Sequence, residues 1–229
     1  MTDSTTHSSD TALAPELLDL LPAPGGWVTA EDLTRTTGRS TRDSEQMLRH
    51  AAYQGFLVDG SLLSGGTPGA WHRPDRATLT RYRVLSGPAG CGKTHTLRTL
   101  WSIEHDDPTI QTWTCDSIPT LDADTAAGHD RYAAGRQASI ELLEEARSVI
   151  GLRSACCGGS FSVSADAPLV IVSVDDAHHL LEDPRAVYLL EGLALLGEAQ
   201  GVVPRVTTTV NSIAVLGSAL LWRNLNHPA

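Results

Sequence analysis

The sequence predicts an α/β fold, in which a parallel β-sheet is flanked by helices and follows a small N-terminal domain. Two observations predict this fold. The glycine-rich segment GPAGCGKT (87–94) stands between a short apolar strand (81–86) and a helix with apolar residues available for packing. The near-continuous apolar run LVIVSV (169–174) is typical of a central parallel strand that is buried on both faces, and two aspartates follow it at once.

Length and composition indicate a globular chain of one or two domains. The chain has 229 residues, of which 41% are hydrophobic and 19% charged, as in proteins that bury a core. No apolar run approaches the about 20 residues that cross a bilayer. The first ten residues lack the basic and apolar regions of a secretory signal. We therefore expect a cytoplasmic protein with no membrane segment and with its four cysteines reduced.

The net charge of −10 is unfavourable for non-specific coating of nucleic acid, which needs clustered basic residues. Any contact with DNA must therefore come from a local patch. Of the 17 basic residues, 16 are arginine, and the single lysine, Lys93, lies in the glycine-rich segment. This placement indicates that ammonium chemistry is required there.

The first third of the chain predicts a disordered tail (1–12) and then a small domain (13–76). Thr29 is a plausible N-cap of the second of three expected helices. The three helices are expected over 15–21, 30–37 and 41–55. Short strands of a hairpin are expected at 56–58, 62–63 and 70–72. Three helices followed by a β-hairpin are the element order of a winged helix-turn-helix.

The segment WVTAEDLTRTTGRSTRDSEQMLRHAAYQGFLVDG resembles that family. The resemblance implies that the third helix enters the major groove of DNA and that the hairpin touches the backbone. The candidate contacts are Arg39, Arg42, Arg49, Arg73 and Arg76. Residues 1–80, however, hold 6 arginines against 10 acidic residues. Many winged helices bind proteins instead, so a protein contact stays open as the alternative.

Residues 87–94 match the pattern GxxxxGK[ST] in full, in the order strand, loop and helix that is typical of a P-loop. The glycines let the backbone fold closely around phosphates, and the exposed N–H groups and the positive helix end then bind the anion. Lys93 is expected to reach the β- and γ-phosphates, and the Thr94 hydroxyl to ligate Mg²⁺. The residues expected to bind the nucleotide are Gly87, Pro88, Ala89, Gly90, Cys91, Gly92, Lys93, Thr94 and His95.

The expected cofactors are ATP and Mg²⁺. ATP is favoured over GTP because no guanine-recognition motif of the N/TKxD type is present. The aspartates after the apolar strand fit a Walker B motif. Asp175 would hold the magnesium ion, and Asp176 would orient or deprotonate the attacking water. Asp176 is shorter than the glutamate usually found in this place, so hydrolysis is expected to be slow.

The remaining elements of the second domain (81–229) follow from apolar patterning. They are a strand at 109–114, a helix at 125–150 with Asp124 as its N-cap, a loop at 151–168, a helix at 184–200 and a strand at 204–210. Asn211, at the tip of the last strand, or Thr209 could sense the γ-phosphate. A plain turn role for Asn211 is an equal alternative. Lys93, Asp176 and Asn211 are the candidate catalytic residues.

The second domain resembles the motor core of FtsK/SpoIIIE-type DNA translocases, particularly their actinobacterial conjugal-transfer relatives. The matching stretches are LGEAQG (196–201), Thr208-Thr209, LGS (216–218) and LWRNL (221–225). The chain departs from the family at Glu198, where the family has a basic residue, and at Thr209, where it has glutamine. The resemblance implies a shortened relative with a RecA-like or AAA-like sheet, and Arg223 is the candidate arginine finger.

The predicted function is an ATPase acting on DNA, with a motor of the FtsK/HerA or AAA type. The expected partners are ATP, duplex DNA, and either further copies in a ring or a larger motor protein. One alternative is a nucleotide-gated adaptor, such as a helicase loader or a replication or transfer accessory protein. Another is a winged-helix DNA-binding regulator with an inactive NTPase fold.

Overall fold

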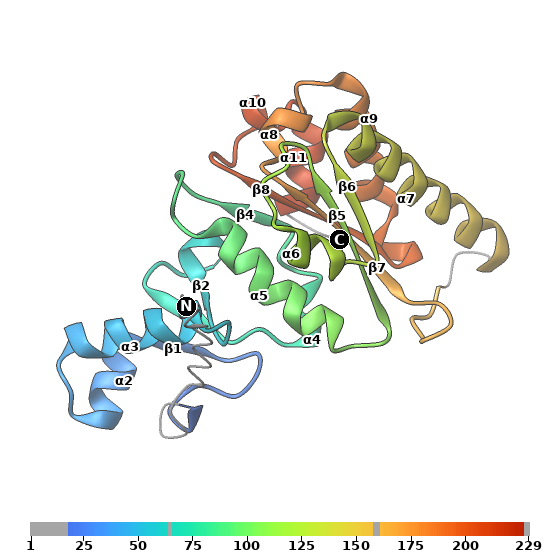
Figure 1. The fold of residues 1–229 in the computed structure, drawn as a ribbon. Coiled ribbons are helices and arrows are strands. Elements are labelled where there is room, and N and C mark those ends of the chain that lie inside the picture. The colour runs from blue at the N-terminus through green and yellow to red at the C-terminus, as the bar shows by residue number, and fades with distance from the viewer. Residues whose placement is uncertain (1–17, 64–65, 158–160, 227–229) are drawn as a thin grey trace, which may run out of the picture.

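The computed structural model describes residues 18–63, 66–157 and 161–226, and it consists of a small N-terminal unit beside a larger α/β unit (Figure 1). The N-terminal unit contains β1 (Trp27–Thr29), α2 (Ala30–Thr37), α3 (Thr41–Tyr53), β2 (Val58–Asp59), a 3₁₀ turn (Gly60–Leu62) and β3 (Ala70–His72). Its three strands are antiparallel and lie in the order β1-β3-β2.

The N-terminal unit has its own apolar core. The core residues are Leu21, Val28, Leu33, Leu48, Ala51 and Leu57. The expected N-cap of α2 is confirmed, because the Thr29 side chain accepts the backbone N–H of Asp32 while the Asp32 carboxylate accepts the N–H of Thr29. This reciprocal pair satisfies two backbone donors that the first helical turn would otherwise leave without a partner.

The strands of this unit differ from those expected. Residues 27–29 form β1, a strand that the sequence did not predict, and β3 pairs with both β1 and β2. Leu62 lies in the 3₁₀ turn, and Leu63 forms a single antiparallel bridge with Leu85 of the larger unit. The tail at 1–12 lies outside the described residues, as does most of the helix expected at 15–21.

The larger unit contains five strands and the helices between them. They are α4 (Arg76–Leu79), β4 (Val84–Ser86), α5 (Lys93–His105), β5 (Ile110–Asp116), α6 (Ala123–Ala127), β6 (Arg131–Ala134), α7 (Arg136–Cys157), β7 (Leu169–Asp175), α8 (Ala177–Leu180), α9 (Pro184–Leu196), a 3₁₀ turn (Glu198–Gln200), β8 (Val202–Thr208), α10 (Ile213–Leu216) and α11 (Ala219–Asn226).

The five strands form one parallel sheet in the order β4-β8-β7-β5-β6, so the expected parallel sheet flanked by helices is confirmed. Side chains alternate between its faces, as strand geometry requires. In β7, Val172 packs against the helices α7 and α9, whereas Ile171 packs on the side of α5. Figure 1 shows α5 on one face of the sheet and α7 and α9 on the other. Both faces are therefore covered, which accounts for the largely apolar sequence of the strand.

The prediction of one helix over 125–150 is wrong for its N-terminal part. Residues 131–134 form β6, which pairs in parallel with β5 at the edge of the sheet. Gly135, with φ of +88°, separates β6 from α7, which runs on to Cys157. Asp124 is not an N-cap, because Asp122 caps the short helix α6 by accepting the N–H of Thr125. Pairing with the free edge of β5 outweighed the helical pattern of the local sequence.

Smaller differences concern element ends. The helix expected at 184–200 ends as α9 at Leu196, and a 3₁₀ turn follows it. The strand expected at 204–210 is β8, and it lies two residues earlier in the chain. None of the helices in the described ranges combines the length and apolar character that a bilayer crossing needs.

Candidate functional site

The segment 87–94 forms a tight loop between β4 and α5. Gly90 and Gly92 have φ of +77° and +97°, a backbone region that side chains with a Cβ rarely adopt. At Gly87, a Cβ would lie 2.7 Å from the Sγ of Cys91 and 3.0 Å from Leu62, so a larger residue there would displace these side chains. The loop is thus shaped by its glycines and is packed against the N-terminal unit.

Lys93 begins α5 and turns back over the loop. Its Nζ donates hydrogen bonds to the carbonyl oxygens of Gly87, at 2.8 Å, and Pro88, at 3.1 Å. The side chain is buried. A cation at the N-terminal end of a helix, over a loop with backbone N–H groups, creates a positive site suited to phosphate.

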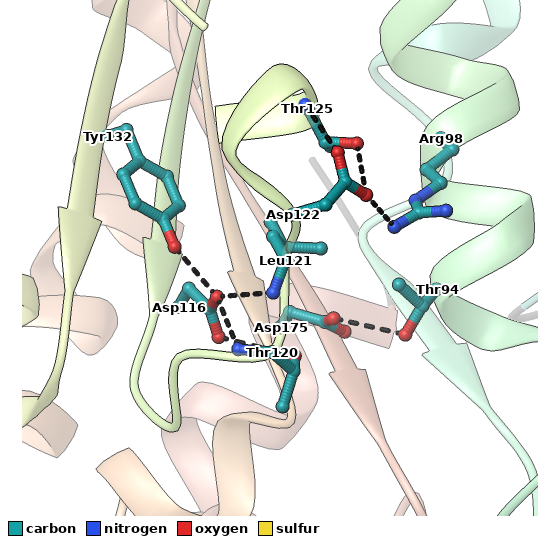
Figure 2. Close-up of polar contacts among 9 residues, drawn as sticks. All are labelled: Thr94, Arg98, Asp116, Thr120, Leu121, Asp122, Thr125, Tyr132 and Asp175. Carbon is teal, nitrogen blue, oxygen red and sulfur yellow. Dashed lines mark hydrogen bonds and ion pairs between the residues drawn. The ribbon is translucent and has the colours of Figure 1, made fainter. Parts of the chain in front are cut away.

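Thr94 and Asp175 come together although 81 residues separate them in the chain. The Thr94 hydroxyl donates to Oδ2 of Asp175 at 3.0 Å (Figure 2). Asp175 is buried at the end of β7, and β7 is separated from β4 by β8 alone. A hydroxyl and a carboxylate oxygen are the hard donors that Mg²⁺ prefers. The two residues therefore fit the magnesium ion that the sequence predicts.

Thr207 on β8 completes this cluster. The sequence did not predict Thr207 as a site residue. Its hydroxyl donates to Oδ1 of Asp175 and accepts the backbone N–H of Asp176. Burial raises the pKa of Asp175, and the hydrogen bonds from Thr207 and Thr94 oppose that rise. The only signal in the sequence was the threonine-rich end of β8, which could not indicate which threonine faces β7.

Asp176 has a strained backbone conformation. Its φ of 47° and ψ of 52° are left-handed, and in the described part of the chain no other residue besides glycine has a positive φ. Such conformations persist where the surrounding structure holds them, often at functional sites. The strain turns the chain from β7 into α8 and leaves the Asp176 carboxylate 48% exposed. The two adjacent aspartates thus have different environments, one buried and one open to solvent.

A cavity of about 470 Å³ lies over the loop. It is lined by Ala89, Gly90, Gly92, Lys93, Thr94, His95, Asp176, His178 and Thr209. Of the two residues considered for γ-phosphate sensing, the structure places Thr209 in the cavity lining. Asn211 instead exchanges side-chain hydrogen bonds with Asn226 of α11, at 2.6 and 3.2 Å. This pairing holds the Asn211 amide against α11.

His95 and Cys91 lie on the side of the loop that faces the N-terminal unit. The imidazole Nε2 of His95 is 2.9 Å from the carbonyl oxygen of Ala52 on α3. The same ring stacks on Tyr53, with 5.5 Å between ring centroids. Arg223, the candidate arginine finger, lies exposed on α11. The loop therefore contacts both the cavity above it and the N-terminal unit beside it.

A second buried acid, Asp116, ends β5 directly beside Asp175 in the sheet register. It accepts hydrogen bonds from the N–H groups of Thr120 and Leu121 and from the hydroxyl of Tyr132 (Figure 2). Burial and this contact raise the pKa of Tyr132 to about 12. Asp116 thereby anchors the loop after β5, and its role is structural.

Comparison with known proteins gives matches in structure. No family model and no curated protein matches the sequence. The pCW3 conjugation coupling protein TcpA, solved in its monomer form with ATPγS, is similar with a TM-score of 0.51 and 16% identity over 62% of this chain. EssC (ATPases 2 and 3) from Geobacillus thermodenitrificans is similar with a TM-score of 0.50 and 17% identity over 68% of this chain.

The chain has the fold of a P-loop ATPase domain. The alignments cover 46% of the TcpA chain and 32% of the EssC chain, so this chain spans about half of their length or less. TcpA was solved with ATPγS, and the EssC structure comprises its ATPases 2 and 3. At these identities the likeness extends to the fold, and the chemistry must be argued from the residues of the site.

Proposed function

We propose that this protein is a Mg²⁺-dependent ATPase that acts on duplex DNA. One observation carries the proposal. A cation, a hydroxyl and two carboxylates lie close together at the carboxyl ends of the parallel strands, beside the glycine-rich loop. Lys93 and Asp176 line the same cavity, and Thr94 hydrogen-bonds Asp175 beneath it. These are the groups that phosphoryl transfer needs for holding phosphates, a metal ion and a nucleophile.

Each residue of the site has a role in this proposal. The N–H groups of the loop and Lys93 bind the phosphates, with Lys93 exchanging its contacts to the Gly87 and Pro88 carbonyls for phosphate oxygens. Thr94 and Asp175 hold Mg²⁺, directly or through water. Bound there, the ion neutralises charge on the phosphate oxygens during transfer.

Asp176 is the residue placed to orient or deprotonate the attacking water. Asp176 lines the cavity and its side chain is about half exposed, while its backbone N–H donates to the Thr207 hydroxyl and fixes the turn that presents it. Thr209 is the candidate sensor of the γ-phosphate in place of Asn211, because it lines the same cavity.

Action on DNA rests on the two sequence resemblances. The chain order β1, α2, α3, β2, β3, with the strands paired in the order β1-β3-β2, supports a winged-helix assignment for the N-terminal unit. On α3, the helix that would enter the groove, Arg42 is exposed, whereas Arg49 pairs with Glu45 at 3.1 Å. A motor of this type would act as a ring of copies, with Arg223 of α11 as the candidate finger.

The test is steady-state phosphate release with Mg²⁺ and ATP, with and without duplex DNA. We expect turnover by the wild type that is lost in Lys93→Ala and reduced at least about tenfold in Asp176→Ala, because each removes a group that acts on the transferred phosphate. Asp166→Ala, an exposed aspartate away from the cavity, is the matched control. Equal phosphate release by the wild type and Lys93→Ala would overturn the proposal.

A nucleotide-gated adaptor is the second candidate. The observation that favours it is the direct contact of α3 with the loop helix, through His95 and Ala52. Nucleotide bound to the loop could thereby change the surface that the N-terminal unit presents. This candidate predicts association with a larger motor in ATP but not in ADP, without DNA-stimulated turnover. Pull-downs that are identical in the two nucleotides would exclude it.

A further inference from the structure

A second cavity, of about 350 Å³, lies between the N-terminal unit and the glycine-rich loop. The N-terminal unit contributes Arg49, Ala52, Tyr53, Leu57, Asp59, Leu62 and Trp71 to its lining, and the loop and α5 contribute Gly90, Cys91, Gly92, His95 and Thr96. Its volume lies in the range of small-ligand pockets. Nothing in the phosphate chemistry described above uses it.

The second cavity adjoins the phosphate cavity. Gly90, Gly92 and His95 line both, so the two spaces meet at the N-terminal end of α5. A nucleotide is a polar phosphate chain joined through a ribose to a flat aromatic base. With its phosphates over Lys93, its other end must leave the phosphate cavity along one side of the loop. The second cavity opens on that path, beside Cys91.

The lining suits a purine ring. Leu57, Leu62 and Trp71 offer apolar contact, and all three belong to the N-terminal unit. Tyr53, which stacks on His95, presents an aromatic face, although 73% of its surface is exposed. Flat rings stack on aromatic side chains with a gain of about 0.5–1.5 kcal/mol beyond simple burial.

The cavity also offers hydrogen bonding to an exocyclic amino group. Asp59 lies in the lining, and its Oδ1 already accepts the N–H and the hydroxyl of Ser61, which holds the carboxylate in place. A fixed carboxylate accepts hydrogen bonds from amino groups and cannot donate one while ionised. Largely apolar walls with a few polar groups, here Asp59 with Arg49 and His95, are typical of a specific ligand site.

We propose that this cavity binds the purine base of the nucleotide whose phosphates the loop holds, so that the N-terminal unit completes the nucleotide site. The inference rests on the proposed function, because it requires a nucleotide at Lys93. It goes further in assigning half of the site to a unit that precedes the ATPase domain in the chain. The N-terminal unit then responds to nucleotide because it touches the base.

The test compares two ligands by calorimetry, MgATP and magnesium tripolyphosphate, which has the phosphate chain but no base. Tyr53→Ala should weaken MgATP binding by about threefold to tenfold and leave tripolyphosphate binding unchanged. Tyr188→Ala is the matched control, since Tyr188 is likewise exposed, at 62%, but lies on α9 away from both cavities. It should change neither affinity.

A second variant fills the cavity. Ala52→Phe places a ring in it while keeping the backbone carbonyl that His95 contacts, and thermal melting checks that the variant is folded. MgATP affinity should fall at least about tenfold and tripolyphosphate affinity should not. Unchanged MgATP affinity in Tyr53→Ala and a folded Ala52→Phe would overturn the inference, and so would an equal loss for both ligands.

Lys93→Ala distinguishes a failure of the proposed ATPase function from a failure of the proposed base site. It should lose both ligands, because both use the phosphate site. If both ligands bound Lys93→Ala and the wild type equally, the proposed function itself would fail and the base site with it. If binding depended on Lys93 but not on Tyr53 or Ala52, the ATPase proposal would stand and the base would lie elsewhere.

Discussion

Thr207 holds both carboxyl-bearing residues at the end of β7 through one hydroxyl group. That hydroxyl lies 2.5 Å from Oδ1 of Asp175 and 2.8 Å from the backbone nitrogen of Asp176. A hydroxyl can donate to one group and accept from another, and here it does both. The orientation of Asp175 and the strained turn at Asp176 therefore depend on a side chain from the neighbouring strand.

Replacing Thr207 with valine should weaken Mg²⁺-dependent ATP binding by about tenfold, because a hydrogen bond to a charged group is lost while the shape is kept. Loss of that donor also raises the pKa of Asp175 further, since burial already raises it. The Mg²⁺ titration should then shift to higher pH. Thr208→Val is the control, because the Thr208 hydroxyl bonds the Val210 carbonyl instead. Indistinguishable titrations of the two variants would contradict this role.

The buried ion pair between Glu104 of α5 and Arg205 of β8 should contribute strongly to the free energy of unfolding, in the sense that removal of one partner is costly. The two side chains are 2.6 Å apart and 0% and 1% exposed. Glu104→Met leaves the Arg205 charge buried without its partner, which should lower the free energy of unfolding by about 3–5 kcal/mol. Urea denaturation monitored by circular dichroism measures the change.

Two comparisons test that explanation. Arg98→Met removes an exposed pair with Asp122 and should cost about 1 kcal/mol or less. The double variant Glu104→Met/Arg205→Met removes both buried charges and should recover much of the lost stability. A double variant as unstable as Glu104→Met would show that packing, and not the unpaired charge, determines the cost.

His129 should make the fold sensitive to acid. Burial, with a smaller contribution from His105, lowers the pKa of His129 from 6.5 to about 4. Between these pH values the unfolded chain binds a proton that the folded chain does not, so stability falls as the pH drops from 6.5 towards 4. His129→Gln should flatten that fall in a series of denaturation curves. His50→Gln, on the exposed side of α3, should leave it unchanged.

The local sequence was sufficient where a residue's role depends on its immediate neighbours. Thr29 caps α2 because Asp32 follows three residues later. The loop at 87–94 follows from its glycines and from the solitary lysine, since backbone freedom and charge are local properties. The apolar run that became β7 was recognisable because a strand covered on both faces has no polar side.

The local sequence was not sufficient where a contact with a distant segment determines the structure of a residue. Residues 131–134 became a strand because the edge of β5 was available for pairing, which no local pattern reveals. The two hydrogen bonds between Asn211 and Asn226 likewise join positions 15 residues apart, and no local pattern reveals them. Thr207 lies on β8 and its hydroxyl faces Asp175, whereas Thr209 lies in the turn after β8 and lines the cavity. The local sequence does not distinguish these two directions.

The α/β class, the glycine-rich loop at 87–94 and the two aspartates after the apolar run were readable from the amino-acid sequence, because glycine conformation, charge and hydrophobic patterning act over a few residues. The hydrogen bonds of Thr207 to Asp175 and Asp176, and the packing of α3 against the loop around a second cavity, became visible in the folded chain alone. Such contacts join residues far apart in the chain, and they exist only once the sheet register and the packing of the two units have placed them together.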